Sequence, residues 1–117
     1  MDWHQGNATD DRDQKGWLIG FFATGDQGVN YSEDVEIKWS DHRAGDVQTD
    51  WEKSQGTSVG ILISGRMRIH FNDGTADLDE QGDYVRFGPG VDHRFSTPTG
   101  GRLITVRWPS RPDQDRD

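Results

Sequence analysis

The stretch Gly82-Asp-Tyr-Val-Arg-Phe-Gly-Pro-Gly-Val-Asp-His93 decides the fold. Its tyrosine, valine and phenylalanine favour extended backbone, so residues 84–87 are predicted to form a β-strand. Pro89-Gly90 is strong turn chemistry, because proline fixes its own φ and Gly90 adopts a positive φ without strain. The chain is therefore predicted to reverse tightly and to hold the imidazole of His93 at the start of the next strand.

The rest of the body follows β patterns. Short apolar or alternating runs are separated by turn residues, and no window has the period of an amphipathic helix. Asn72-Asp73-Gly74 is a hairpin signal. Many short strands without helices indicate an all-β sandwich or barrel. The predicted strands are residues 16–22, 35–39, 59–64, 66–71, 84–87, 93–96 and 103–108.

The order of these segments resembles the cupin family. A glycine-ended strand, Ile61-Leu-Ile-Ser-Gly65, is followed by a strand-turn-strand over 66–78 and then by the segment 82–93. That last segment is similar to the second cupin motif, in which a glycine is followed after a short strand by Pro-x-x-x-His. The resemblance implies a cupin-type double-stranded β-helix, which is a jelly-roll barrel.

The chain departs from the first cupin motif, where the family places His-x-His and then Glu before the glycine-ended strand. Counting back from Gly65, the glutamate position falls at Thr57 or Ser58 and the histidine pair at Trp51 and Lys53. None of these residues binds a divalent cation well, and the lysine would oppose one. His93 alone is not a metal site, because catalytic metals keep about three protein ligands. The resemblance therefore implies a metal site that is degenerate or absent.

Two alternatives remain to a protein without a working metal site: a metal bound at a displaced set of residues, and catalysis without metal. His42, His93 and Glu36 form a candidate two-histidine, one-carboxylate set for Fe, Mn, Ni or Zn, displaced from the family position. Without metal, His93 or His42 is a candidate acid–base residue of a lyase or isomerase.

A ligand pocket is a further expectation. In segment 35–39 the apolar residues alternate with charged ones, and the apolar face is expected to point to the core. If the sheet curves into a barrel, the charged face instead lines a cavity. Aromatic walls with one or two charged groups are typical of small-molecule pockets. The candidate pocket residues are Glu36, Lys38, Trp39, Trp51, Tyr84 and Arg107.

Composition limits the partners. The 117 residues carry a formal charge of −8, which repels nucleic acid and anionic membranes. The acidic residues are mostly Asp, and such a surface suggests a salt-loving source. The sequence contains no cysteine and no apolar run long enough for a membrane span or a signal peptide, so we expect a cytoplasmic protein.

The polar segments 1–14 and 111–117 are predicted to be disordered tails around a single domain over 15–110. Pairing through edge strands would make this domain a homodimer. We expect a small-molecule-binding module, with an enzyme as the alternative and an accessory protein with an empty barrel as a third hypothesis.

Overall fold

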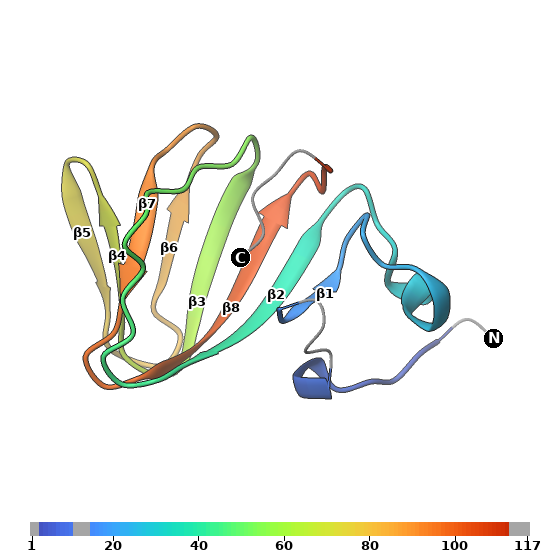
Figure 1. Cartoon of the computed structure of the whole chain (residues 1–117), viewed down its shortest axis with the longest axis horizontal. Helices are drawn as coiled ribbons and strands as arrows, with labels where there is room; N and C mark the ends of the chain where they lie inside the picture. Colours follow the sequence, from blue (N-terminus) through green and yellow to red (C-terminus); the bar gives the residue numbers. More distant parts are fainter. Residues whose placement is uncertain (1–2, 11–14, 113–117) are drawn as a thin grey trace.

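The computed structural model describes residues 3–10 and 15–112. This part of the chain holds β-strands and two 3₁₀ helices, but no α-helix. The elements in chain order are η1 (Ala8–Asp10), β1 (Trp17–Ile19), η3 (Gly25–Asn30), β2 (Glu36–His42), β3 (Thr57–Gly65), β4 (Met67–Phe71), β5 (Gly74–Leu78), β6 (Tyr84–Phe87), β7 (His93–Ser96) and β8 (Gly101–Trp108) (Figure 1).

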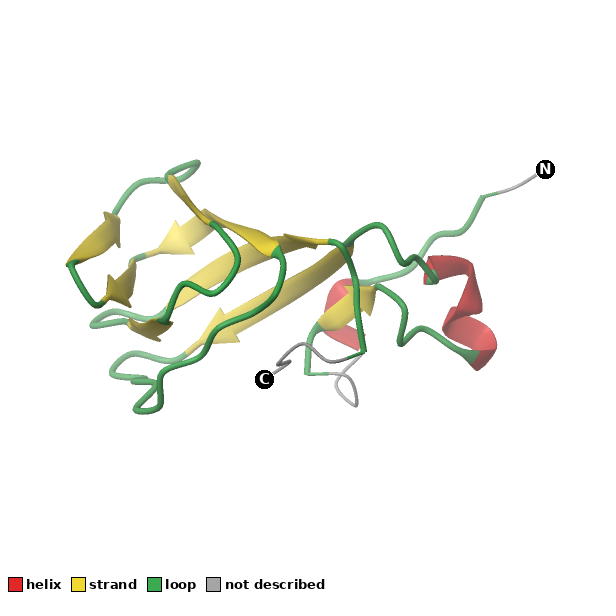
Figure 2. Cartoon of the chain, turned by 90° about the horizontal axis from the view of Figure 1, so that it is seen from above, coloured by secondary structure: helices red, strands yellow, loops and turns green. Residues whose placement is uncertain are grey.

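Two sheets face one another (Figure 2). The larger sheet has the order β1-β2-β8-β3-β6 and the smaller one the order β5-β4-β7. All pairings within them are antiparallel, and β8, the last strand in the chain, lies between β2 and β3. The predicted all-β jelly-roll architecture is therefore confirmed.

The turns form where the sequence predicts them. Phe71 pairs with Gly74, so Asn72 and Asp73 make the two-residue loop of the β4–β5 hairpin. Gly90 has a φ of +76°, and its amide donates to the carbonyl of Ser54. The Pro89-Gly90 turn thus delivers His93 to the first position of β7.

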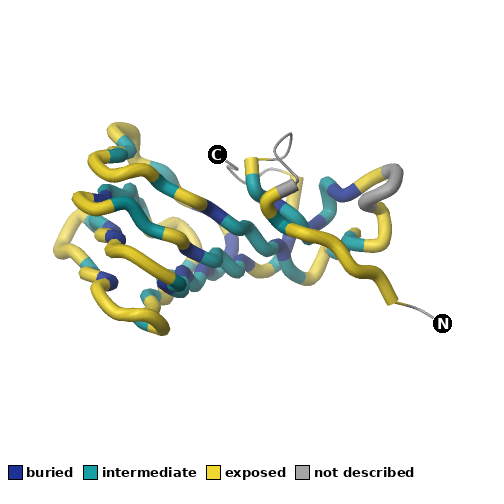
Figure 3. The backbone as a smooth tube through the Cα atoms, turned by 90° about the horizontal axis from the view of Figure 1, so that it is seen from below, coloured by how far each residue is buried: buried dark blue, intermediate teal, exposed yellow. Residues whose placement is uncertain are grey.

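The apolar core occupies one end of the space between the sheets. Leu62, Met67, Leu78 and Leu103 are buried there, with Val85 and Phe95 packed against them. Figure 3 shows the buried positions gathered on the strands that face one another. Burying these side chains removes apolar surface from water, which is the main driving force for closing the two sheets.

The side chains of β2 that point into the barrel are not the ones that the sequence predicted. Glu36 is fully buried and Ser40 nearly so, whereas Val35, Ile37 and Trp39 are only half-buried. The prediction that the apolar face points inward was wrong, because the interior at this end of the barrel is a polar cavity. The apolar residues of β2 lie instead on the outer face of the larger sheet.

The only helices in ranges 3–10 and 15–112 are the two 3₁₀ helices. Neither of them is long and apolar enough to cross a membrane. The predicted tails, 1–14 and 111–117, lie partly outside the described ranges. Between them, the strands run from residue 17 to residue 108.

Candidate functional site

A cavity of about 110 Å³ lies between the two sheets, next to the apolar core. One side of it continues the core and is apolar. Its apolar lining comprises Met67, Ile69, Val85, Phe87, Phe95 and Leu103. The opposite side is polar, and Trp17 stands among its charged groups.

Strand register places the polar groups in two rows across the larger sheet. Glu36 pairs with Arg107, and Arg107 pairs on its other side with Ser58. Two residues further along β2, Lys38 pairs with Thr105 of β8. Because neighbouring residues in register point to the same face of a sheet, the two rows present hydroxyls beside charged groups.

Glu36 and Arg107 form an ion pair within this wall. The Arg107 Nε donates to Glu36 Oε1 at 3.2 Å, and the two side chains are only 7% and 0% exposed. Buried charges need partners of this kind, because transfer from water costs several kcal/mol for each ion. The pair fixes a guanidinium at the edge of the cavity.

Trp17 is the aromatic centre of the polar side. Its ring lies 4.8 Å from the Arg107 Cζ and 5.6 Å from the Lys38 Nζ, measured to the ring centroid, so two cations flank it. The residue is only 4% exposed, yet its Nε1 donor has no acceptor among the residues that the structure describes. A buried donor without an acceptor is unusual in a folded protein.

His93 and Glu52 meet at the wall formed by β7 and the loop before β3. They exchange both backbone hydrogen bonds, at 2.9 and 2.8 Å, and both line the cavity. The His93 Nδ1 donates to the carbonyl of Val91 at 3.1 Å. Since a carbonyl only accepts, Nε2 is the basic nitrogen of the neutral ring. A base and a carboxylate are therefore neighbours on one wall.

His42 lines the cavity at the end of β2. Its ring lies 4.3 Å from that of Phe95, measured between centroids. Burial lowers the pKa of His42 below 6.5, and the charge of Lys38 lowers it further. Asp46, 4.0 Å away, acts in the opposite direction but does not outweigh them. At neutral pH His42 is thus uncharged, and it faces the same cavity as the Lys38 ammonium.

Four of the residues named from the sequence line the cavity: His42, His93, Lys38 and Arg107. Glu36 is not a lining residue, but its ion pair with Arg107 joins it to the wall.

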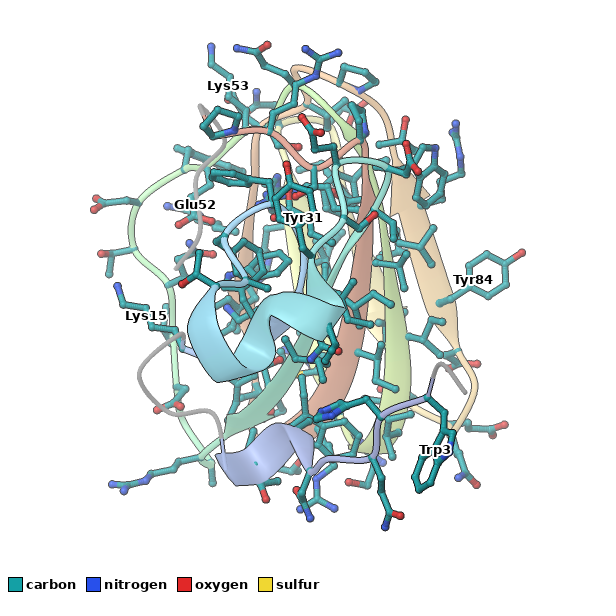
Figure 4. All side chains as sticks on the ribbon, turned by 90° about the vertical axis from the view of Figure 1, so that its right-hand side faces the viewer. Trp3, Lys15, Tyr31, Glu52, Lys53 and Tyr84 are labelled. Carbon is teal, nitrogen blue, oxygen red and sulfur yellow. The ribbon has the colours of Figure 1, made fainter. Side chains whose placement is uncertain are left out.

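The other three named residues do not line the cavity. Trp39 lies on the outer face, where its indole donates to Asp41 at 3.3 Å and the Arg102 guanidinium covers its ring. Trp51 is 41% exposed beneath the guanidinium of Arg94. Tyr84 projects from β6 away from the barrel, as Figure 4 shows.

Glu52 is the wall residue that the sequence analysis missed. The count back from Gly65 assigned the histidine positions of the family motif to Trp51 and Lys53. Residues alternate between two faces in extended backbone, so an offset of one residue exchanges inward and outward positions. Glu52 faces the cavity, and Lys53 points outward (Figure 4). The sequence offered only the acidic side chain of Glu52, between Trp51 and Lys53, as a hint of a polar wall residue.

The residues present do not fit the metal that the resemblance implies. Within residues 3–10 and 15–112, no group of three or more His, Cys, Asp or Glu could hold a metal ion. The candidate set of His42, His93 and Glu36 therefore does not come together, and Glu36 is paired with Arg107. At the first-motif positions, Glu52 and Ser58 face the cavity in place of a full ligand set.

Solved structures share this architecture. KdgF from Halomonas sp. is 17% identical, with a TM-score of 0.63 over 73% of this chain and 79% of that protein. A cupin superfamily protein from Desulfitobacterium hafniense is 18% identical, with a TM-score of 0.60 over 66% and 69%. A cupin-2 domain protein from Shewanella frigidimarina is 20% identical, with a TM-score of 0.53 over 62% and 69%. No protein-family profile and no curated protein matches the chain.

The two facing antiparallel sheets and the polar cavity between them define a small jelly-roll barrel protein. Its structural neighbours show that this barrel is the cupin fold.

Proposed function

We propose that this cupin barrel binds a small organic molecule in its cavity without the help of a metal ion. The observation that carries this proposal is the wall itself: a buried ion pair, a second cation and a buried indole surround one cavity. Polar groups that converge on a pocket with many apolar lining residues are typical of ligand sites.

The metal-free part of the proposal is supported by the ligand chemistry. Lys38 and Arg107 bring positive charge into the space where a cation would bind, and Glu36 is already engaged by Arg107. His93 and Glu52 supply at most two donors, one fewer than catalytic metals usually keep.

Binding and metal content test this proposal together. We expect protein purified without chelator to contain no stoichiometric Fe, Mn, Ni or Zn by elemental analysis. We also expect at least one compound in a panel of small acids, sugars and amines to raise the melting temperature. The substitution His93→Ala removes a wall residue and should abolish that shift, with a small loss of stability.

The matched control is His70→Ala. His70 bonds Thr75 and Ser96 and does not line the cavity, so this variant should bind as the wild type does. One equivalent of metal that is lost on His42→Ala or His93→Ala would contradict the metal-free proposal. If His93→Ala binds normally but unfolds far more easily, His93 is structural.

A second candidate function is metal-free acid–base catalysis, favoured by the neighbouring His93 and Glu52. An imidazole base beside a carboxylate is a common arrangement for proton transfer. Enzyme turnover in metal-free protein that falls with both Glu52→Gln and His93→Ala would favour it. Ligand that is bound and released unchanged would favour the binding module.

We also propose that two copies pair through the outer face of the larger sheet. Register places half-buried apolar residues side by side on three adjacent strands of that face: Ile37, Trp39, Val59, Ile61, Ile104 and Val106. The chain carries a charge of −8, yet the charged residues facing outward from β2, β6 and β8 are the pair Asp41–Arg102 and Arg86. A second copy therefore meets less repulsion here than a net charge of −8 would suggest.

Sedimentation equilibrium tests this pairing. Wild type should sediment as a dimer, and Ile104→Lys, on the middle strand β8 between Trp39 and Ile61, should give a folded monomer. The control Tyr84→Lys at the rim should remain dimeric. A monomeric wild type at all concentrations would overturn the pairing.

We propose a cytoplasmic location, supported by the absence of cysteine from the sequence. Detection of the protein in fractionated source cells tests it, and recovery outside the cytoplasmic fraction would contradict it.

A further inference from the structure

We propose that the end of the cavity around Trp17 is a carboxylate-binding subsite, so that the ligand is a small organic acid with an apolar body. This inference rests on the proposed binding function and specifies the chemical class of the ligand. It follows from three features of the cavity wall: an unused donor, two cationic side chains beside it, and apolar residues that also line the cavity.

The unused donor is the indole N–H of Trp17. The residue lines the cavity and is 4% exposed, and this nitrogen finds no acceptor among the described residues. Neither bulk water nor any residue in ranges 3–10 and 15–112 satisfies it, although burying an unsatisfied donor costs free energy. Indole nitrogen only donates, so its missing partner is an acceptor. A ligand oxygen in the cavity supplies that acceptor.

Charge selects the kind of acceptor. The Lys38 ammonium and the Arg107 guanidinium both lie within 6 Å of the Trp17 ring, at 5.6 and 4.8 Å from its centroid. Glu36 is the carboxylate paired with Arg107. A ligand carboxylate beside the indole would therefore lie close to two cationic side chains. Hydrogen bonds to a charged acceptor are also stronger than those to a neutral one.

The cavity lining is both polar and apolar. Next to Lys38 and Arg107 in register stand the hydroxyls of Thr105 and Ser58. The same cavity is also lined by apolar side chains, among them Leu103, Val85 and Phe95. A molecule with a carboxylate at one end and a hydrocarbon body at the other can meet both kinds of group. A sugar, with polar groups along its whole length, would leave hydroxyls unsatisfied against the apolar wall.

The Trp17 indole proton provides a direct readout. In ¹H–¹⁵N spectra of the protein labelled at tryptophan, its resonance is assigned as the signal that disappears in Trp17→Phe. We titrate sodium hexanoate and, as the matched neutral compound, hexanamide. Hexanoate should move the Trp17 indole proton downfield, because a carboxylate accepts its hydrogen bond. The indole signals of Trp39 and Trp108 should stay in place, because neither residue lines the cavity.

Variants separate charge from packing. Lys38→Met keeps the length of the side chain without its charge and should weaken hexanoate binding at least about tenfold, the loss typical of one charge-assisted hydrogen bond. Trp17→Phe keeps an aromatic ring without the donor and should weaken hexanoate more than hexanamide. Trp39→Phe, on the outer face, should bind both compounds as the wild type does. The spectrum of each variant reports whether it is folded.

The results of the titration distinguish failure of the carboxylate subsite from failure of cavity binding as a whole. If hexanamide binds as tightly as hexanoate and the Trp17 signal does not move, the carboxylate subsite is wrong while cavity binding stands. If neither compound moves the methyl signals of Val85 and Leu103 at millimolar concentration, both the subsite and the proposed function fail for molecules of this class. If sodium chloride moves the Trp17 signal as hexanoate does and blocks hexanoate, the site takes an inorganic ion and the organic-acid inference is overturned.

Discussion

Glu36 and Arg107 face each other at paired positions of β2 and β8, and their ion pair is buried at the edge of the cavity. They are separated by 3.2 Å, and the two side chains are almost fully removed from bulk water. This relationship ties the stability of the barrel to the chemistry of its cavity.

Removing one partner should therefore destabilise the fold strongly. Glu36→Gln leaves the Arg107 guanidinium buried without its counter-ion, and we expect a loss of about 3–5 kcal/mol in the free energy of unfolding. Urea denaturation followed by circular dichroism measures it.

The double variant Glu36→Leu/Arg107→Met should lose less than the sum of the two single variants, because it leaves no uncompensated charge. The control Asp41→Asn breaks the exposed pair with Arg102, whose side chains are 52% and 47% exposed, and should cost at most about 1 kcal/mol. Equal losses for Glu36→Gln and Asp41→Asn would show that burial does not set the strength of these pairs.

His42 should make stability depend on pH. Its pKa in the folded protein lies below the ordinary 6.5, so the folded state disfavours its charged form. Above 6.5 the imidazole is neutral in both states and the stabilisation is complete. As the pH falls below 6.5 the unfolded chain binds the proton first, so stability falls until the folded pKa is passed. Melting temperatures measured from neutral pH downward should show this fall.

Three variants locate the effect. His42→Phe keeps a ring against Phe95 but cannot titrate, so the fall in melting temperature below pH 6.5 should be shallower. Lys38→Met removes a charge that lowers the pKa and should also flatten the curve, whereas Asp46→Asn should steepen it. A curve that His42→Phe leaves unchanged would assign the dependence to another group.

Part of the fold could be predicted from local sequence alone. In segment 82–93 the strand-forming residues and the Pro89-Gly90 turn lie within a few positions of one another, so their conformation does not depend on distant parts of the chain. The predicted turn and strand, and His93 at the start of β7, are all found in the structure. Residues of the predicted strand 66–71 alternate as well, and its apolar Met67 and Ile69 are buried in the structure.

Tertiary context decided the rest. Alternation in 35–39 identifies two faces but not which one points inward, and a barrel with a polar interior reverses the usual assignment. Glu52 was missed because no local signal fixes the register of its segment against β7. Trp17 was assigned only to an apolar run, since its missing acceptor and its two neighbouring cations appear only when β1, β2 and β8 come together.

Gly65, which ends β3, should tolerate no side chain. It has a φ of +74°, and a Cβ there would lie against the carbonyl oxygen of Gly100, closer than any normal contact. Gly65→Ala adds this clash to the strain of a left-handed alanine, which is about 1–2 kcal/mol. Gly90 is the matched control, because its φ of +76° is similar but nothing lies within 4 Å of its Cβ position. Gly90→Ala should cost only the strain, and equal losses in urea denaturation would contradict the clash.

The last prediction concerns salt. The formal charge of −8 destabilises the compact state by self-repulsion, and salt screens that repulsion over a Debye length of about 10 Å at 0.1 M. Salt also weakens the exposed pairs, such as Asp41 with Arg102, but these contribute little. We therefore expect the melting temperature to rise with added KCl.

The double variant Asp50→Lys/Glu80→Lys changes two exposed acids by two charges each and reduces the net charge from −8 to −4. Its melting temperature should rise less over the same KCl series, since less repulsion remains to be screened. A flat or falling curve for the wild type would remove the argument for a salt-adapted protein, and identical slopes would show that net charge is not the cause.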